Sequence, residues 1–405
     1  MKYTIGELAD IIDGDRGKNY PQQHEFLEEG YCLFLNTGNV TSSGFSFESN
    51  QFISKEKCDI LRKGKLSRND IVYTTRGTVG NAAFYSESVP YEHVRINSGM
   101  VIIRPNEEIV STRFLYQILK SNYYRPYFKK YCTGSAQPQL PIKNFSKIEL
   151  DLPELAIQQR IADILSGYDD LIENNQKQIK LLEEASQRLY KEWFVDLRFP
   201  GYENAPIADG VPEGWSIRKL ETFGDIITGK TPSTANESYY NGNIPFVKIP
   251  DMHNTIYPII TETTLSEEGA NTQKNKFIPK NSIMVSCIAT VGLVNIAVEE
   301  CQTNQQINSI VLNDLRDLYY LYFSTKGLKM ILDGVGSNGA TMTNVNKSKF
   351  ANIEVLYPTT NLRERFYDFC KPIFEKILVL SQSTMELKNS RDQLLPKLIS
   401  GELEV

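Results

Sequence analysis

Residues 153–193 read PELAIQQRIADILSGYDDLIENNQKQIKLLEEASQRLYKEW, and residues 358–398 read PTTNLRERFYDFCKPIFEKILVLSQSTMELKNSRDQLLPKL. In both stretches apolar or small residues recur in alternating steps of three and four, with one additional step of four. The two patterns coincide without a gap at a shift of 205 residues. This spacing is typical of a coiled-coil seam, and about 37 residues of helix extend about 55 Å. The sequence therefore predicts two long helices.

The two predicted seams match position by position. The first comprises Ile157, Ile161, Ile164, Tyr168, Ile172, Asn175, Ile179, Leu182, Ser186, Leu189 and Trp193, and the second comprises Leu362, Phe366, Phe369, Ile373, Ile377, Leu380, Thr384, Leu387, Arg391, Leu394 and Leu398. Two matched seams in one chain favour packing of the helices against each other, and a polar Asn175 would help to fix their register. The alternative, in which each helix packs on its own domain, stays open.

The segments that precede the two helices also repeat, at a shift of about 205 to 215 residues. The matching landmarks are Asp10–Gly14 with Asp225–Gly229, Asn69–Val72 and Thr78–Gly80 with Asn281–Met284 and Thr290–Gly292, and Ile96–Ser98 with Ile307–Ser309. Short β-branched and aromatic runs at 70–75, 100–104 and 244–248 predict strands, and shorter helices are predicted at 111–131 and 314–333. We expect an α+β protein in which two tandem mixed α/β globules alternate with the long helices.

Composition places the chain among ordinary folded proteins. Its 405 residues are 41% hydrophobic and 23% charged, and 44 basic against 49 acidic side chains give a net charge of −5. This balance gives no global basic field. Six single cysteines without a CxxC pair, and a start that contains Glu7 and Asp10, predict a cytoplasmic protein with free thiols. Three histidines without a ligand spacing predict no metal site.

Three stretches suggest functions that their context argues against. Residues 281–298 carry no charge, but the turn at Thr290–Gly292 predicts a buried hairpin and not a membrane helix. Gly224–Thr231 (GDIITGKT) matches the P-loop expression, yet its interior is Ile226–Ile227 and Pro232 follows it. Gly334, Gly336 and Gly339 match GxGxxG, but they follow a helical pattern and are expected to form a loop. No Pro-Pro dipeptide of a base-flipping methyltransferase is present. We predict no catalytic residues.

Polar loops in both halves carry side chains suited to DNA. Asn and Gln can pair with adenine, Arg with guanine and Asp with cytosine, while Lys, Ser and Thr suit phosphates. Two similar modules on a spacer would suit two half-sites of one duplex. The candidate residues are Asn36, Thr37, Asn39, Thr75, Arg76, Ser135, Gln137, Gln139, Lys143, Lys230, Thr231, Lys248, Asp251, His253, Asn304, Gln305, Gln306, Asn338, Thr341, Asn344 and Lys347.

Four stretches together resemble the specificity subunit of type I restriction-modification enzymes, over nearly the whole chain. They are LYKEWFVDLRFPGYE (189–203), VPEGW (211–215) with TGKTPS (228–233), IELDLPELAIQQRI (148–161) and LLPKLISGEL (394–403). The resemblance implies target-recognition domains at 1–154 and 215–358, spacer helices at 155–198 and 359–405 that pair antiparallel, and a linker at 199–214.

The resemblance also implies the function and the partners. Each recognition domain would read one half of a bipartite DNA site, and the helices would set the separation. The subunit would not be catalytic and would bind no cofactor. Two modification subunits would bind S-adenosylmethionine, and restriction subunits, if present, would use ATP and Mg²⁺. The expected residues of the spacer and of partner docking are Ile157, Ile161, Ile172, Asn175, Leu182, Leu189, Trp193, Phe194, Leu362, Phe366, Leu387, Leu394 and Leu398.

Two departures from internal symmetry stand out. The first half begins at Met1–Tyr3 without the Pro-Glu-Gly-Trp stretch that opens the second, and the second helix starts with Arg363–Arg365 where the first has Gln158–Arg160. We therefore expect the helix contacts to differ between the halves. The alternative function is a non-catalytic scaffold whose long helices recruit partner proteins.

Overall fold

The structure is a computed structural model that describes residues 1–134, 137–336 and 344–404. The chain forms two compact units. Unit 1 comprises Met1–Glu173 and Glu386–Val405, and unit 2 comprises Asn174–Met385. Each unit therefore contains one globular module, together with the first part of one long helix and the last part of the other.

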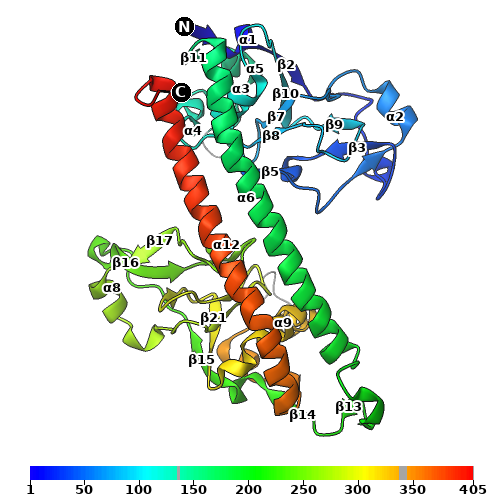
Figure 1. Ribbon diagram of the computed structural model, residues 1–405, viewed down its shortest axis with the longest axis vertical. Helices are drawn as coiled ribbons and strands as arrows, with labels where there is room; N and C mark the ends of the chain where they lie inside the picture. Colours follow the sequence, from blue (N-terminus) through cyan, green and yellow to red (C-terminus); the bar gives the residue numbers. More distant parts are fainter. Residues whose placement is uncertain (135–136, 337–343, 405) are drawn as a thin grey trace. The chain divides into compact units, whose positions relative to one another are not determined.

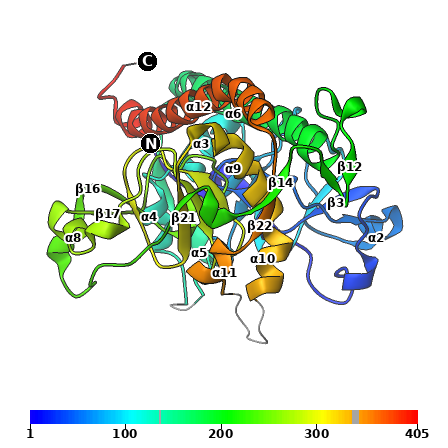
Figure 2. The same ribbon diagram turned by 90° about the horizontal axis from the view of Figure 1, so that it is seen from below.

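The predicted long helices are present as α6 (Leu155–Tyr190) and α12 (Thr360–Ser400), and α6 continues into a π-helical turn at Lys191–Val195. Figures 1 and 2 show them running alongside each other. In unit 2 Asn175 Nδ2 donates to Ser383 Oγ at 3.3 Å, and Ser186, further along α6, bonds Cys370, which is earlier on α12. The pair is therefore antiparallel, and Asn175 contacts the partner helix as predicted.

The predicted seam is wrong at one equivalent position in each helix. Ile164 and Phe369 are 41% and 44% exposed, whereas the next residues, Leu165 and Cys370, are fully buried. The buried side of each helix is rotated at this point because the first part of the helix packs on its own module as well as on the other helix. Both interpretations of the apolar pattern therefore hold, for different faces of the same helices.

Each long helix is anchored to its module at an equivalent point. In unit 1 the buried Gln158 Oε1 accepts from Ser111 N at 3.0 Å, and its Nε2 donates to Pro153 O at 2.9 Å. Ser111 is the N-cap of α3 (Thr112–Lys120). In unit 2 Arg363 occupies the position of Gln158 and forms a buried ion pair with Asp317, the N-cap of α9 (Leu318–Gly327). One contact is neutral and the other is charged.

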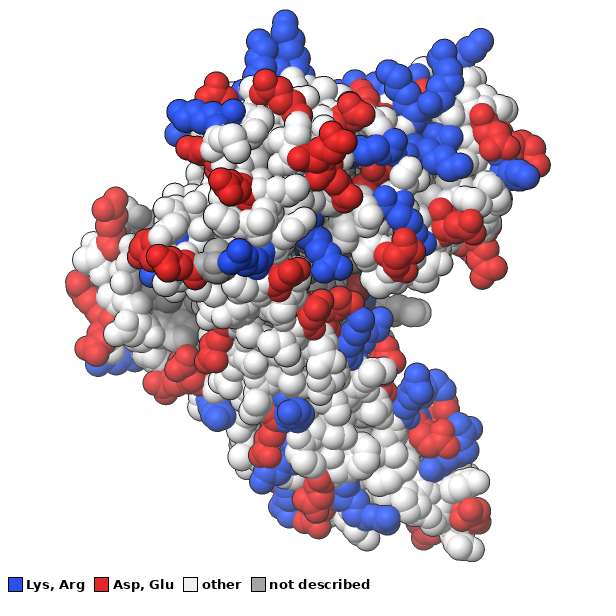
Figure 3. All heavy atoms as spheres, turned by 45° about the horizontal axis from the view of Figure 1, so that its top comes forward, with Lys and Arg blue, Asp and Glu red and all other residues white. Residues whose placement is uncertain are grey.

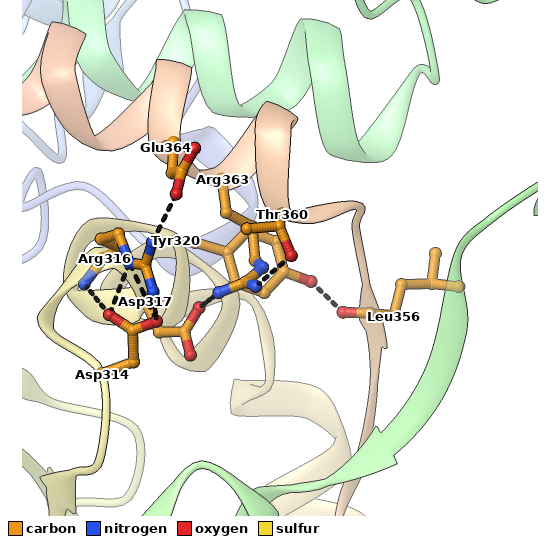
Figure 4. A network of polar contacts seen from close by, with 8 residues as sticks. All are labelled: Asp314, Arg316, Asp317, Tyr320, Leu356, Thr360, Arg363 and Glu364. Carbon is orange, nitrogen blue, oxygen red and sulfur yellow. Dashed lines mark hydrogen bonds and ion pairs between the residues drawn. The ribbon is translucent and has the colours of Figure 1, made fainter.

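The charged anchor lies in a wider polar network (Figure 4). Arg363 Nη2 donates to Thr360 Oγ1 at 3.2 Å, and the guanidinium lies 4.3 Å from the centre of the Tyr357 ring. Burial raises the pKa of Asp317, and the charge of Arg363 opposes this rise. The guanidinium thus compensates a carboxylate that the protein interior disfavours.

The module of unit 1 contains a four-stranded antiparallel sheet in the order β2 (Ala9–Asp13), β10 (Met100–Pro105), β7 (Ile71–Thr74), β8 (Ala82–Phe84). A second sheet has the order β6 (Phe52–Ile53), β3 (Cys32–Leu35), β9 (Val94–Ile96), in which β3 and β9 are parallel. The remaining elements are β1 (Lys2–Thr4), paired with β11 (Glu149–Asp151), β4 (Val40–Thr41), paired with β5 (Gly44–Phe45), and the helices α1 (Ile5–Leu8), α2 (Lys55–Ile60), α4 (Arg125–Lys129) and α5 (Ile142–Phe145).

The module of unit 2 has the same plan. Its four-stranded sheet has the order β15 (Gly224–Thr228), β21 (Ile307–Leu312), β18 (Ile283–Ser286), β19 (Val294–Ile296), and its three-stranded sheet has the order β17 (Thr263–Leu265), β16 (Tyr240–Val247), β20 (Gln302–Thr303). The other elements are β12 (Ile207–Ala208), paired with β13 (Val211–Pro212), β14 (Ser216–Lys219), paired with β22 (Glu354–Tyr357), and the helices α7 (Ile249–Met252), α8 (Glu267–Asn271), α10 (Lys329–Gly336) and α11 (Lys347–Ala351).

Strand register aligns the two modules residue by residue. Ile11 pairs with Ile103 and Ile103 with Ile71, as Ile226 pairs with Ile310 and Ile310 with Ile283. The match of Ile96–Ser98 with Ile307–Ser309 is therefore wrong. By position in the sheets, Met100 corresponds to Ile307, and the Asn-containing turn before it corresponds to the turn at Asn304–Gln306.

The stretches with alternative interpretations are now placed. The predicted hairpin is confirmed, because β18 and β19 pair antiparallel across the turn at Thr290–Gly292. Residues 224–228 of the P-loop match form strand β15. Gly334 and Gly336 end helix α10, and Gly339 lies outside the described residues. Within the described ranges no helix has both the length and the apolar composition needed to cross a membrane.

Loss of the charged anchor should destabilise unit 2. We predict that Arg363→Met lowers its free energy of unfolding by about 3–5 kcal/mol, because Asp317 is left buried without a counter-charge. The loss should be larger at pH 8 than at pH 5, since Asp317 takes up a proton in the folded variant at lower pH. Trp193 and Trp215, the two tryptophans of the chain, both lie in unit 2. Urea unfolding followed by tryptophan fluorescence therefore reports this unit.

Two variants test the reason for that loss. Arg188→Met removes an arginine that is 83% exposed on α6 and should change stability by less than about 0.5 kcal/mol. Arg363→Gln combined with Asp317→Ser installs the neutral pair of unit 1, and we expect it to recover at least half of the lost stability. Equal destabilisation by Arg188→Met and Arg363→Met would contradict the role of the anchor.

Candidate nucleic-acid interface

An asparagine turn precedes the central strand of the four-stranded sheet in both modules. Asn97 Oδ1 accepts from Gly99 N at 2.9 Å, and Asn304 Oδ1 accepts from Gln306 N at 3.1 Å. These are Asx turns, in which the side chain replaces a backbone acceptor two residues ahead. The same side-chain bond thus shapes equivalent loops of two modules.

A second loop and a third segment are joined to each asparagine turn by backbone bonds. Thr75 N donates to Gly99 O at 2.9 Å and Cys287 N to Gln306 O at 2.8 Å. Leu140 N then donates to Thr75 O, and Val345 N to Cys287 O, each at 2.9 Å. These bonds bring Gln139 of one module and Asn344 of the other beside the turns.

A glycine after the first strand allows a further loop to approach the turn. A Cβ atom on Gly14 would lie 2.3 Å from Asn97 O, and one on Gly229 would lie 2.2 Å from Asn304 O. Two residues further on, Arg16 Nη2 donates to Ser98 O at 3.3 Å, and Thr231 Oγ1 donates to Gln305 Oε1 at 2.7 Å. Only glycine permits this close packing without a backbone shift.

The two modules therefore share a backbone frame but present different side chains on it. We define recognition face 1 as Arg16, Thr37, Arg76, Ser98 and Gln139, and recognition face 2 as Lys230, Thr231, Gln305, Gln306 and Asn344. At equivalent positions Arg16 is replaced by Thr231, Ser98 by Gln305, and Gln139 by Asn344. Thr37 belongs to face 1 because a Cβ atom on Gly99 would meet its methyl group at 2.8 Å.

Four predicted contact residues have structural roles. Asn39 is 2% exposed, and its Oδ1 accepts from Asn36 N at 2.9 Å, as Asp251 Oδ2 accepts from Lys248 N at 2.8 Å. Both side chains cap the helical turn that follows the first strand of the three-stranded sheet. Thr75 is 5% exposed and Asn304 is 8% exposed, and both hold the frame. Their placement at the base edges is therefore wrong, whereas Asn36 and Lys248 remain half-buried at the rim.

The other predicted residues lie around the faces or outside the description. Gln137 is exposed, Lys143 is exposed on α5, and Lys347 is exposed at the start of α11. His253 is exposed directly after α7. Ser135, Asn338 and Thr341 lie outside the described residues.

The sequence reasoning missed Arg16 and Ser98. Arg16 is half-exposed and also pairs with Asp13 at 3.2 Å. The signal was available, because the match of Gly14 with Gly229 places Arg16 at the position of Thr231, which was a candidate.

The predicted spacer residues mostly face the interior of their own unit. Ile161, Ile172, Asn175, Phe194, Leu362, Phe366 and Leu398 are buried, and Ile157, Leu182, Leu189, Trp193, Leu387 and Leu394 are half-buried. The buried members hold the helices in place, so they offer no docking surface to a partner. Exposed apolar side chains on the helices are instead Ile164, Leu171, Leu181, Phe369 and Val379.

The charges around the faces are mixed. Residues 1–155 carry 19 basic and 18 acidic side chains, and residues 201–355 carry 12 and 16. On the molecular face drawn in Figure 3, both signs are interspersed. Cys287 stands at the position of Thr75, and burial raises the pKa of its thiol to about 11, opposed by hydrogen bonds to Asn308. This cysteine is therefore a neutral thiol and not an activated nucleophile.

Comparison with known proteins decides the family. The sequence matches the family described as Type I restriction modification DNA specificity domain over residues 1–184 and 212–389, most of the chain and both modules. The chain belongs to the type I restriction-modification specificity family. It is thus a DNA specificity subunit, and the two modules are its DNA recognition domains. Specificity subunits are non-catalytic.

Individual relatives agree with this assignment. The specificity subunit of type I restriction enzyme HindI from Haemophilus influenzae is 31% identical, and the alignment covers 96% of this chain and 98% of the relative. The MjaIX specificity subunit from Methanocaldococcus jannaschii is 30% identical, over 84% of this chain and 78% of that one. The S subunit structure from M. genitalium has a TM-score of 0.56 at 15% identity and covers 98% of this chain and 96% of its own, so it supports the fold.

The glycine approach gives a stability prediction for this specificity subunit. We expect Gly229→Ala to lower the free energy of unfolding of unit 2 by about 1–3 kcal/mol, because the new methyl group meets backbone atoms that must shift. The amide of Lys230, which donates to Thr303 O at 2.9 Å, should exchange with deuterium faster. Gly327→Ala is the control, because its Cβ atom would meet open space. Identical exchange at Lys230 in both variants would contradict the shared frame.

Proposed function

We propose that recognition face 1 and recognition face 2 each read one half of a bipartite DNA site, and that the paired helices set the separation of the two halves. One observation carries this proposal. The modules repeat the same loop frame, down to the side-chain bonds of Asn97 and Asn304, while the side chains presented on it differ. A repeated frame with different hydrogen-bonding groups suits two related but unequal half-sites.

The chemistry of the faces favours different bases. Face 1 presents Arg76 and Gln139, groups that pair bidentately with guanine and adenine. Face 2 presents Gln305 and Asn344, which both suit adenine, and Lys230 beside them suits a phosphate. At the position of Arg76, unit 2 has Ile288, which forms an isolated bridge with Asn344 as Arg76 does with Gln139. The half-site read by face 2 is therefore less dependent on guanine.

The proposed partners supply the chemistry that this subunit lacks. Two modification subunits dock on the helix pair and the adjoining surfaces, bind S-adenosylmethionine and methylate adenine within the site. Restriction subunits, where present, add ATP- and Mg²⁺-dependent translocation and cleavage. The complex acts in the cytoplasm on double-stranded DNA. A scaffold that recruits proteins through its helices is the alternative, and it requires no sequence preference on DNA.

Adenine methylation tests the assignment of one half-site to each face. In cells that express the chain with its modification subunit, single-molecule sequencing should reveal a split methylated motif that is absent without the chain. Gln139→Ala should relax one half of this motif and Gln305→Ala the other, each by about tenfold to a hundredfold in discrimination, the value of a bidentate base contact. Gln393→Ala, an exposed glutamine on α12, is the matched control. Relaxation of the same half by both face variants would refute the assignment.

The spacer role predicts a change in motif length. Four residues inserted in each helix, after Asn175 and after Leu380, add about 6 Å of helix at each point. We expect the methylated motif to gain non-specific base pairs between unchanged half-sites. An unaltered motif from a folded, active complex would show that the helices do not determine the separation.

A further inference from the structure

The linker of unit 2 covers the end of α6 with two aromatic rings. Trp215 directly precedes β14, and its ring centroid lies 5.9 Å from that of Phe194 and 5.2 Å from that of Phe199. Trp215 and Phe199 are 8% and 6% exposed. They join the large core of unit 2, so the end of this helix is closed off from solvent.

Strand pairing identifies the equivalent place in unit 1. Ile5 N donates to Ile148 O as Leu220 N donates to Ile353 O, both at 2.9 Å. Met1 therefore stands at the position of Ser216, immediately after the position of Trp215. The counterpart of Phe194 on α12 is Ile399, at the same shift of 205 residues.

A groove of about 810 Å³ lies at this place in unit 1. We call it the tyrosine groove. It is lined by α4 and the residues before it, by β11 and the residues after it, and by the end of α12. The lining residues are Tyr123, Tyr124, Pro126, Tyr127, Lys130, Glu149, Leu150, Asp151, Leu152, Pro153, Pro396, Ile399 and Ser400.

The walls of the groove suit an aromatic ligand on an extended backbone. Tyr123 is 60% exposed, and its ring lies edge-on to Tyr124 at 5.2 Å. Burial raises the pKa of Tyr124 to about 12. Tyrosine and proline walls recur where proteins bind extended peptides, and aromatic rings favour offset or edge-to-face neighbours. A volume of this size accommodates a tryptophan and several neighbouring residues.

We propose that the tyrosine groove binds an extended segment of a modification subunit through a tryptophan or phenylalanine side chain. This inference rests on the proposed docking of modification subunits. Two observations favour this occupant. The equivalent place in unit 2 holds Trp215 and Phe199, and the groove continues onto α12 through Pro396, Ile399 and Ser400, so it adjoins the helices on which docking is proposed.

The proposal makes the two docking sites unequal. A modification subunit on unit 1 gains the groove contact, whereas one on unit 2 meets a place already filled by the chain itself. The two subunits should therefore bind in two steps of different affinity.

A fusion that fills the groove from within tests the proposal. Val-Pro-Glu-Gly-Trp is placed before Met1, so that its tryptophan takes the position of Trp215, and Val-Pro-Glu-Gly-Ser is the matched control. Binding of the purified modification subunit is followed by calorimetry. We expect the tryptophan fusion to weaken one of the two binding steps at least tenfold and the serine fusion to weaken neither. Tyr123→Ser, at an exposed position, should weaken the same step.

Four outcomes would overturn the inference. Unchanged binding of two subunits by both the tryptophan fusion and Tyr123→Ser would remove the groove from the docking surface. A solvent-exposed emission of the fused tryptophan would contradict the chemistry of the groove. Self-association of the unmodified chain that the fusion abolishes would assign the groove to a second copy. Failure of every variant and of the parent chain to bind any modification subunit would instead refute the docking on which the inference rests.

Discussion

The contact between each long helix and the first residue of a short helix in its module is the constraint on which the rest of the structure depends. Gln158 meets the N-cap Ser111, and Arg363 meets the N-cap Asp317. These contacts fix the face that each long helix turns toward its module. They also explain why the helical repeat has no gap. One inserted residue in a packed helix would turn its apolar side by about 100°, while a loop absorbs an insertion at little cost.

The same geometric task is performed by different chemistry in the two halves. A neutral glutamine satisfies three backbone groups in unit 1, whereas unit 2 buries a guanidinium and a carboxylate together. The recognition faces show this contrast again, since a conserved-in-position Asx turn carries Ser98 in one module and Gln305 in the other. A backbone frame held by its own hydrogen bonds leaves the outward side chains free to differ. This separation of frame from contact group is what a protein needs to read two unlike half-sites.

Periodicity was sufficient to predict the long helices, their pairing and the hairpin around Thr290–Gly292, because burial on one side leaves a pattern in the sequence. It failed at Ile164 and Phe369, since a helix that faces both a module and another helix has two buried directions and the pattern does not distinguish them. Composition placed Asn39 and Asp251 among the DNA contacts, because a polar side chain that caps a turn has the same sequence signature as one that reads a base. Arg16 was missed because its role depends on a backbone approach that becomes visible only when Gly14 is seen against Asn97.

The central claim is that two equivalent faces bind two separate halves of one DNA site. Hydroxyl-radical footprinting of the assembled complex of this chain with its modification subunits on its own methylation site tests it most directly. The account predicts two protected patches whose centres are about one helical turn, or a small multiple of it, apart. Changing Arg16 and Arg76 should remove one patch, and changing Lys230 and Gln305 the other. A single continuous footprint that shrinks uniformly with either set of changes would contradict the account.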